Sequence, residues 1–389
     1  MMLVPYGRQD IQDSDVAAVL DVLKSDFLTQ GPVVPLFEKA VSEFCGATHA
    51  VAVNSATSAL HIALLALGVG FGDRVWTSPN TFVASSNAAL YCGAEVDFVD
   101  IDPETYNISI EALKKKLEQS SASGALPKVL IPVHFSGQPC DMLAIKELSK
   151  QYGFKIVEDA SHAIGGRYLG NAIGNCEYSD ITVFSFHPVK IVTTAEGGMA
   201  LTNNPILAEQ MVLFRSHGIT RNPSLMTQVP EGPWHYEQIA LGFNYRMTDL
   251  QAALGVNQMQ RLEGYVERRH EIAARYTKEL SDLPLLLPKQ AEFAYSAYHL
   301  YVIGLDLEAI KPLSHSEVFQ ALHERGILVN LHYIPVHTQP YYQKKGFQWG
   351  DFPNAEAYYK SAISIPMFPT LSSVAQTKVI ATLHDILAK

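Results

Sequence analysis

Two neighbouring stretches decide the fold: FKIVEDASHA at residues 154–163 and DITVFSFHPVKIVTTAEGG at residues 180–198. Each opens with an apolar run of the length and composition of a buried strand. Asp159 falls at the carboxyl end of the first predicted strand, and Lys190 comes just after the second. Ligands of open α/β sheets bind at these strand ends, so we expect both side chains at one site. Glu158 should point to the opposite face, because strand side chains alternate.

The same alternation of strand and helix extends outward from these stretches. Near-continuous apolar strands separated by amphipathic helices are typical of an α/β protein whose mostly parallel sheet is covered on both faces. The pattern predicts strands over 49–53, 74–78, 94–100, 128–135, 154–160, 180–186 and 197–203. It predicts helices over 13–25, 33–45, 57–67, 82–91, 110–119 and 142–152.

The pattern changes after Gly242 and indicates a smaller α+β unit. We expect two domains, a large domain with an N-terminal arm over residues 1–255 and a small C-terminal domain over residues 256–389. In this second part the sequence predicts helices over 248–264 and 266–280, a strand over 298–305, a helix over 314–326, a loop over 330–346 and a last helix.

Composition narrows the function classes. The 389 residues are 48% hydrophobic and 17% charged, as in soluble globular proteins. The net charge of −10 argues against nucleic acid or an anionic membrane as the main partner. Four dispersed cysteines without a C-x-x-C pair, and a start without a basic segment before an apolar core, predict a cytoplasmic protein without a zinc motif.

Three local features suggest chemistry, and each has a plainer alternative. Burial of Lys190 among Val and Ile would lower its pKa and make it a nucleophilic amine able to form a Schiff base, although a surface lysine would fit as well. A buried Asp159 would need a cationic partner, unless it only caps a turn. The turn NSATSA at 54–59 could present backbone N–H groups to a phosphate, or be an ordinary helix cap.

Together these features occur in the order used by fold-type I (aspartate aminotransferase-like) enzymes of pyridoxal 5′-phosphate (PLP). The sequence resembles the DegT/DnrJ/StrS-type sugar aminotransferases over nearly its whole length. The resemblance is carried by LTQGPVVPLFEKAVSEFCGATHAVAVNSATSALHIAL (28–64), TSPNTFVASSNA (77–88), VEDASHAIGG (157–166), FSFHPVKIVTTAEGGM (184–199), LFRSHGI (213–219) and GFNYRMTDLQAALG (242–255).

The resemblance implies a role for each matching cofactor residue. Lys190 would bind PLP covalently and then shuttle the proton, and Asp159 would pair with the protonated pyridine nitrogen. Phe82 would stack on the cofactor, unless it is core. His162 would contact the cofactor's ring or phenolic oxygen, unless it is structural. The phosphate would be held by Ser185, by the backbone of Ala56 and Thr57, and by Asn244 of a neighbouring subunit, which implies a homodimer with shared active sites.

Within the family, PYGRQ, PVHFSGQ and HYIPVHTQPYY look most like the members of the pseudaminic-acid pathway. These members aminate C4 of a UDP-linked 4-keto-6-deoxy-N-acetylhexosamine, and family analogy suggests L-glutamate as the donor, leaving as 2-oxoglutarate. The implied substrate residues are Tyr6, Phe27, Leu28, Thr29, Gln30, Arg246, His332 and Tyr333. Arg246 would meet a substrate carboxylate or the UDP phosphates, or could equally form an exposed ion pair. His332 and His337 do not suggest a metal site, since Pro335 separates them.

Two alternatives use the same fold. Some family members carry histidine in place of the lysine and are deoxysugar dehydratases, whereas Lys190 favours transamination. A PLP-binding sensor protein would hold the cofactor without a deep sugar pocket, and the sequence has no DNA-binding module or basic stripe to support one.

Overall fold

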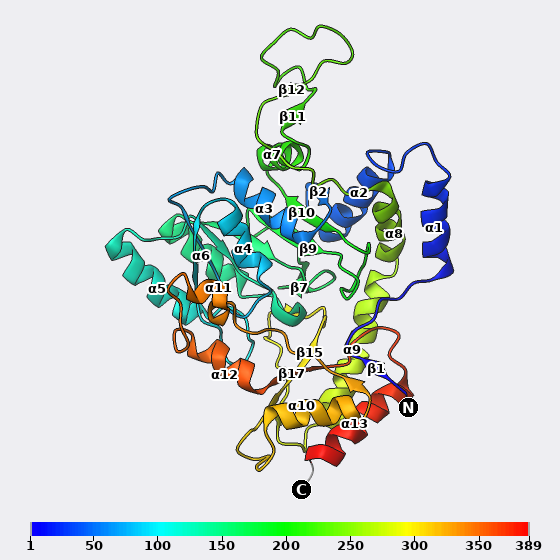
Figure 1. Cartoon of the computed structure of the whole chain (residues 1–389), viewed down its shortest axis with the longest axis vertical. Coiled ribbons are helices and arrows are strands. Elements are labelled where there is room, and N and C mark those ends of the chain that lie inside the picture. The colour runs from blue at the N-terminus through cyan, green and yellow to red at the C-terminus, as the bar shows by residue number, and fades with distance from the viewer. Residues whose placement is uncertain (1, 388–389) are drawn as a thin grey trace.

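A seven-stranded sheet forms the centre of the computed structural model, which describes residues 2–387 (Figure 1). The strand order is β2-β10-β9-β6-β5-β3-β4. All seven are predicted strands, and their bounds are β2 His49–Val53, β3 Arg74–Thr77, β4 Glu95–Phe98, β5 Val129–Ile131, β6 Lys155–Asp159, β9 Ile181–Ser185 and β10 Gly198–Thr202. Pairing is parallel from β9 to β4, whereas β10 runs antiparallel to both β9 and β2. The sheet is therefore mixed, and the prediction of a mostly parallel α/β sheet is confirmed.

Helices cover both faces of this sheet. Alternate strand residues enter separate cores, as in β5, where Val129 and Ile131 pack on one side and Leu130 on the other. The core with Val129 and Ile131 also contains residues of α3 (Ala56–Ala66), α4 (Ala84–Tyr91) and α7 (Pro205–Arg215). The opposite face packs against α2 (Val33–Cys45), α5 (Ile110–Ser123), α6 (Met142–Tyr152) and α8 (Asp249–Met259).

Helix α7 was missing from the sequence prediction although it carries a start signal. Asn204 caps it by accepting from the N–H groups of Ile206 and Leu207, and Pro205 occupies the first turn. The break between the two helices predicted around residue 265 was also misplaced. Helix α8 ends at Met259 and α9 (Leu262–Glu279) begins three residues later.

The C-terminal unit is built on a three-stranded antiparallel sheet of order β13-β15-β17. Its strands are β13 Leu285–Leu286, β15 Tyr301–Leu305 and β17 Ala362–Ile365, and its helices are α10 His315–Glu324, α12 Pro353–Ser361 and α13 Ser373–Leu387. The sequence prediction missed α12 and β17. The predicted loop 330–346 contains the short helices Val336–Thr338 and α11 (Pro340–Gln343). The first strand, β1 (Val4–Pro5), pairs with β16 (Ile327–Leu328) of this unit. A domain division at residue 255 stays a prediction.

Smaller elements complete the chain. A hairpin of β11 (Ile219–Thr220) and β12 (Glu237–Gln238) projects beyond α7 in Figure 1, while α1 (Asp13–Leu23) packs beside α8. Another small sheet joins β14 (Ala294–Tyr295), β7 (Arg167–Tyr168) and β8 (Asn171–Ala172). Among the helices of residues 2–387, none is both long and apolar enough to cross a membrane.

Candidate active site

A cavity of about 920 Å³ lies at the carboxyl ends of β6 and β9. Its volume is large enough for a cofactor and a substrate group together. The N-terminus of α3 and the segment 330–333 form two further parts of its lining. The cavity brings together most of the predicted site residues, namely Tyr6, Ala56, Thr57, Phe82, Asp159, His162, Ser185, Lys190, His332 and Tyr333.

Asp159 ends β6 as a buried carboxylate. Its Oδ2 accepts from Ser85 Oγ at 2.6 Å, and its Oδ1 accepts from the Ser161 N–H at 3.1 Å. It is 5% exposed, lines the cavity, and forms no ion pair with a protein cation at contact distance within residues 2–387. A buried carboxylate of this kind is suited to a ligand that brings a positive charge.

Lys190 lies on the loop that follows β9 and lines the same cavity. Burial lowers the pKa of its ammonium to about 8, and the negative charge of Asp159 opposes part of this shift. Near neutral pH a larger fraction of this amine is therefore unprotonated than in an exposed lysine. The unprotonated amine is the form that attacks a carbonyl carbon.

Glu158, adjacent to Asp159, faces away from the cavity as the strand alternation predicts. Its carboxylate lies 2.7 Å from His134 Nε2 and accepts hydrogen bonds from the hydroxyls of Ser179 and Thr182. All four side chains are buried. The two adjacent acids therefore differ in role: Glu158 forms buried hydrogen bonds away from the cavity, and Asp159 faces the cavity.

The start of α3 forms the part of the cavity suited to a phosphate. Ser55 caps the helix by accepting from the Ser58 N–H at 3.1 Å, and Ala56 and Thr57 of the first turn line the cavity. Gly198 lets β10 approach this turn, since a Cβ there would lie 2.4 Å from the Ser55 carbonyl carbon and 2.5 Å from the Ala56 nitrogen. First-turn N–H groups and the helix dipole favour an anion here.

Aromatic and imidazole rings form another wall. The backbone N–H of Ser136 donates to His162 Nδ1 at 3.3 Å, so the ring proton of neutral His162 is on Nε2, 3.1 Å from the Tyr333 hydroxyl. Phe82 is 58% exposed, and its ring centre lies 6.0 Å from that of Tyr333. An exposed phenylalanine inside a cavity is available to stack on a planar ligand, whereas a core phenylalanine would be covered by protein.

His332 extends this wall toward Tyr6. The two ring centres lie 5.3 Å apart, and His332 Nδ1 lies 2.8 Å from Ser364 Oγ. His337 is separate from them and pairs with Glu356 at 3.0 Å. Across residues 2–387, no three His, Cys, Asp or Glu side chains converge as a metal site.

Six predicted site residues do not line this cavity within one chain. Thr29 forms a β-bridge with Thr248 just before α8, and Arg246 forms one with Val53 at the end of β2; neither lines the cavity. The others are Phe27, Leu28, Gln30 and Asn244. Their side chains are exposed or half-buried, and their roles stay predictions.

Sequence reasoning missed several residues that line the cavity or support it. Ser85 lies in the family segment 77–88, four residues after Thr81. This spacing of about one helical turn was a usable signal, since the two hydroxyls lie 2.7 Å apart. His299 had no such signal, because it reaches the cavity from the C-terminal unit. Further lining residues are Ser161, His187, Glu196, Gln251 and Asn330.

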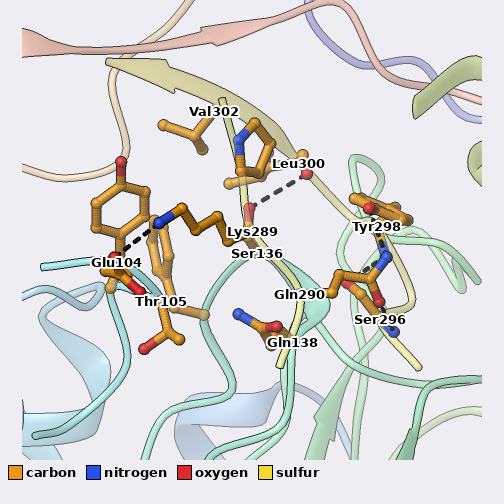
Figure 2. Close-up of a pocket in the computed structure, with 13 residues that line it drawn as sticks. Glu104, Thr105, Ser136, Gln138, Lys289, Gln290, Ser296, Tyr298, Leu300 and Val302 are labelled. Atoms are coloured by element: carbon orange, nitrogen blue, oxygen red, sulfur yellow. Dashed lines mark hydrogen bonds and ion pairs between the residues drawn. The ribbon is translucent and has the colours of Figure 1, made fainter. Parts of the chain in front are cut away.

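A second, much smaller crevice lies beside the cavity and is shown in Figure 2. Its volume of about 20 Å³ holds no more than a water molecule or so. One wall is closed by the ion pair of Lys289 with Glu104 at 2.7 Å, and another by the contact of Ser136 with Leu300 (Figure 2). The crevice is a packing seam between β15 and the loops after β4 and β5.

Comparison with known proteins places this architecture in a family. Residues 9–384 match the DegT/DnrJ/EryC1/StrS aminotransferase family, so the chain belongs to that family. It is a PLP-dependent sugar-nucleotide aminotransferase with the family's α/β fold.

Three similar proteins cover almost the whole chain. The spore coat polysaccharide biosynthesis protein SpsC of Bacillus subtilis is 40% identical over 98% of this chain and 97% of its own. A UDP-4-amino-4,6-dideoxy-N-acetyl-beta-L-altrosamine transaminase of Campylobacter jejuni is 38% identical over 100% and 98%. The solved structure of Helicobacter pylori PseC, an aminotransferase of pseudaminic acid biosynthesis, superposes with a TM-score of 0.89 at 30% identity over 99% of both chains.

The cofactor of the family is PLP, as solved PLP and PMP forms of Spr1654 from Streptococcus pneumoniae illustrate. The cavity fits this group. It is lined by the buried carboxylate of Asp159, the amine of Lys190 with its lowered pKa, the exposed ring of Phe82 and the first turn of α3. When bound, PLP supplies an electron sink for the carbon next to the transferred nitrogen. Asp159 would lie at its pyridine nitrogen, Phe82 at its ring face, and Ala56, Thr57 and Ser185 at its phosphate.

Proposed function

We propose that this protein transfers the amino group of L-glutamate to C4 of a UDP-linked 4-keto-6-deoxy-N-acetylhexosamine, in pseudaminic acid biosynthesis. The observation that carries the proposal is that Asp159 and Lys190, whose pKa is lowered to about 8, line one cavity of about 920 Å³. The names of the Campylobacter and Helicobacter relatives support the substrate and the pathway. The four cysteines, all free in the structure, support a reducing cytoplasm.

The chain's own residues divide the work between two half-reactions. The Lys190 amine takes the proton from the carbon that bears the donor's amino group and later delivers a proton to C4 of the sugar. The Asp159 carboxylate would stabilise the positive charge of the cofactor's pyridine nitrogen through both half-reactions. One product must leave before the other substrate enters the shared cavity, so we expect ping-pong kinetics.

We further propose a homodimer with two shared active sites. Asn244 and the loop Phe27–Gln30 lie outside the cavity of their own chain, and Phe27 is 55% exposed. Trp234 and Leu241 of the projecting hairpin segment are also largely exposed. A second subunit would cover these side chains and place Asn244 at the neighbouring phosphate site. It would bring Arg246 to a substrate carboxylate or to the UDP phosphates.

The absorption spectrum of the purified protein with PLP, before and after L-glutamate, tests the proposal. We expect a yellow band that disappears with glutamate alone, followed by formation of the aminated UDP-sugar, measured by mass spectrometry. A band that is indifferent to glutamate would favour a dehydratase, a different amino donor or a sensor protein. A glutamate response without turnover of any UDP-keto sugar would contradict the substrate, in which case the polysaccharide sugars implied by SpsC are the next to test.

A further inference from the structure

His299 is a buried histidine of the cavity wall that the steps above leave unused. It is 3% exposed, lines the cavity, and packs with its ring centre 4.5 Å from that of His162. Its Nδ1 is sealed from solvent and has no hydrogen-bond partner among the described residues. Nε2 is not among the sealed atoms without a partner, and the ring lines the cavity, so we infer that the Nε2 edge faces the cavity.

The backbone that carries His299 is held by an unusual buried cation. Arg269 of α9 is 1% exposed and donates to the carbonyl oxygens of Tyr298 at 3.0 Å, His299 at 3.1 Å and Met367 at 3.1 Å. No acid pairs with it in the described chain, and burial lowers its pKa to about 9. A buried guanidinium is costly, so its use on this backbone indicates that the position of the segment matters.

Strained residues hold the same segment from the other side. Tyr298 and Ser136 both adopt left-handed backbone angles, with φ of 45° and 62°. Ser136 Oγ donates to the Leu300 carbonyl at 3.2 Å (Figure 2), and a Cβ on Gly137 would lie 3.0 Å from the His299 nitrogen. Such strain persists where packing over-determines it, and it is concentrated at functional sites.

The surroundings of the ring determine what it can offer a ligand. A buried N–H without an acceptor is rarer than an unused lone pair, so the proton of neutral His299 belongs on Nε2. Burial and the nearby Lys190 keep the pKa of His299 well below its usual value, and the ring stays uncharged. His299 therefore presents one neutral N–H donor beside Lys190.

We propose that His299 Nε2 donates a hydrogen bond to the carboxylate on the reacting carbon of the amino-acid donor. This inference rests on the proposed function. Lys190 must reach the carbon that bears the amino group, and the α-carboxylate is bonded directly to that carbon. The diphosphate of a sugar nucleotide lies many bonds from the reacting C4. Within this chain no arginine lines the cavity, and His299 offers an uncharged N–H donor beside Lys190 for this contact.

Two isosteric substitutions of His299 in the PLP-loaded enzyme test the proposal. The amide nitrogen of glutamine lies near the position of Nε2, and that of asparagine lies near Nδ1. We expect His299→Asn to raise the Kd of glutarate, a non-reacting dicarboxylate, and the KM of glutamate by about 10-fold or more, as for a lost bond to a charged group. We expect His299→Gln to stay within about 3-fold of the wild type for the same reason.

The control is His323→Gln. His323 of α10 bonds to the Val329 carbonyl outside the cavity, so its substitution should leave the Kd of glutarate and the KM of glutamate unchanged. His299→Phe keeps the ring shape without a donor, and it should behave like His299→Asn even where the latter folds poorly. Absorbance of bound PLP and the Tm verify that each variant is folded and loaded.

The outcomes separate this proposal from the proposed function. Equal losses in His299→Gln and His299→Asn, no loss in either, or no glutarate binding by the wild type would overturn the carboxylate contact. A wild type that binds glutarate with the expected dependence on His299, but does not respond to glutamate, would retain the contact and refute the aminotransferase reaction with this donor.

Discussion

Ser85 Oγ donates to Asp159 Oδ2 at 2.6 Å, which joins the first turn of α4 to the end of β6. The contact holds the carboxylate in one orientation toward the cavity. Its neighbour Ser86 is equally buried but directs its hydroxyl to Tyr342, 2.6 Å away. Two adjacent serines therefore offer a matched comparison.

We expect Ser85→Ala to weaken PLP binding by about 10-fold, because a hydrogen bond to a charged group is lost. Ser86→Ala removes the same atom from the next residue of the helix, and the Kd of PLP should stay within about 2-fold of the wild-type value. Titration of the apoprotein with PLP, followed by absorbance, measures both. Equal weakening in the two variants would mean that Ser85 acts only through packing.

We expect Lys190→Ala to fold and dimerise but to turn over at less than about a thousandth of the wild-type rate, since loss of a nucleophile has effects of this size. Lys128→Ala, which removes a partly exposed lysine paired with Asp73, is the control. Steady-state rates and circular dichroism check the expectation. Substantial turnover by the alanine variant would remove Lys190 from its proposed role.

The lowered pKa of Lys190 predicts a pH dependence. The neutral amine should predominate above a pH of about 8, so labelling of Lys190 by acetic anhydride in the apoprotein should rise through a midpoint there. Asp159→Asn should move this midpoint to lower pH, because the carboxylate stabilises the ammonium. Mass spectrometry of the labelled peptide measures the profile, with the exposed Lys39 as the reference site.

A midpoint that stays above pH 10, as in a solvated lysine, would show that Lys190 is not desolvated. A midpoint that moves upward in Asp159→Asn would contradict the direction of the electrostatic effect.

Glu158 and Asp159 should give opposite results on substitution. Glu158→Ala leaves buried His134 without its partner and should lower the free energy of unfolding by about 3 kcal/mol. The exposed pair Glu147–Lys150 is the control, and Glu147→Ala should change this free energy by less than about 0.5 kcal/mol. Urea unfolding measures both variants.

Asp159→Asn should keep its fold and lose activity, since its side chain faces the cavity. Loss of stability in Asp159→Asn with retained activity would reverse the assignment of the two acids.

A shared site predicts complementation between inactive subunits. Lys190→Ala and Asn244→Ala should each be nearly inactive alone, yet a refolded equal mixture should have about a quarter of its sites intact, because hybrid dimers carry one complete site. Activity of the mixture against each parent measures this. A mixture no more active than its parents would place Asn244 and Lys190 in the same subunit's site.

The main-sheet strands were predictable because mostly apolar segments alternate with amphipathic helices there, and that signal is local. The misses have physical reasons too. β17 is a four-residue strand that follows α12 without a turn residue between them, so no punctuation marks the change. The break between α8 and α9 has neither Gly nor Pro at Gln260 and Arg261, and it depends on tertiary packing instead.

By itself the sequence determined the class of this protein, because Asp159, Lys190 and the turn before α3 each follow directly from a strand of the main sheet, namely β6, β9 and β2. Only the tertiary structure decided the opposite wall. His162 lies 3.1 Å from the hydroxyl of Tyr333, which is 171 residues away in the chain. Hydrogen bonds from Arg269 to the His299 carbonyl and from Ser136 to the Leu300 carbonyl hold the segment that carries His299. Such contacts depend on how the C-terminal unit packs on the central sheet, and no local pattern encodes that packing.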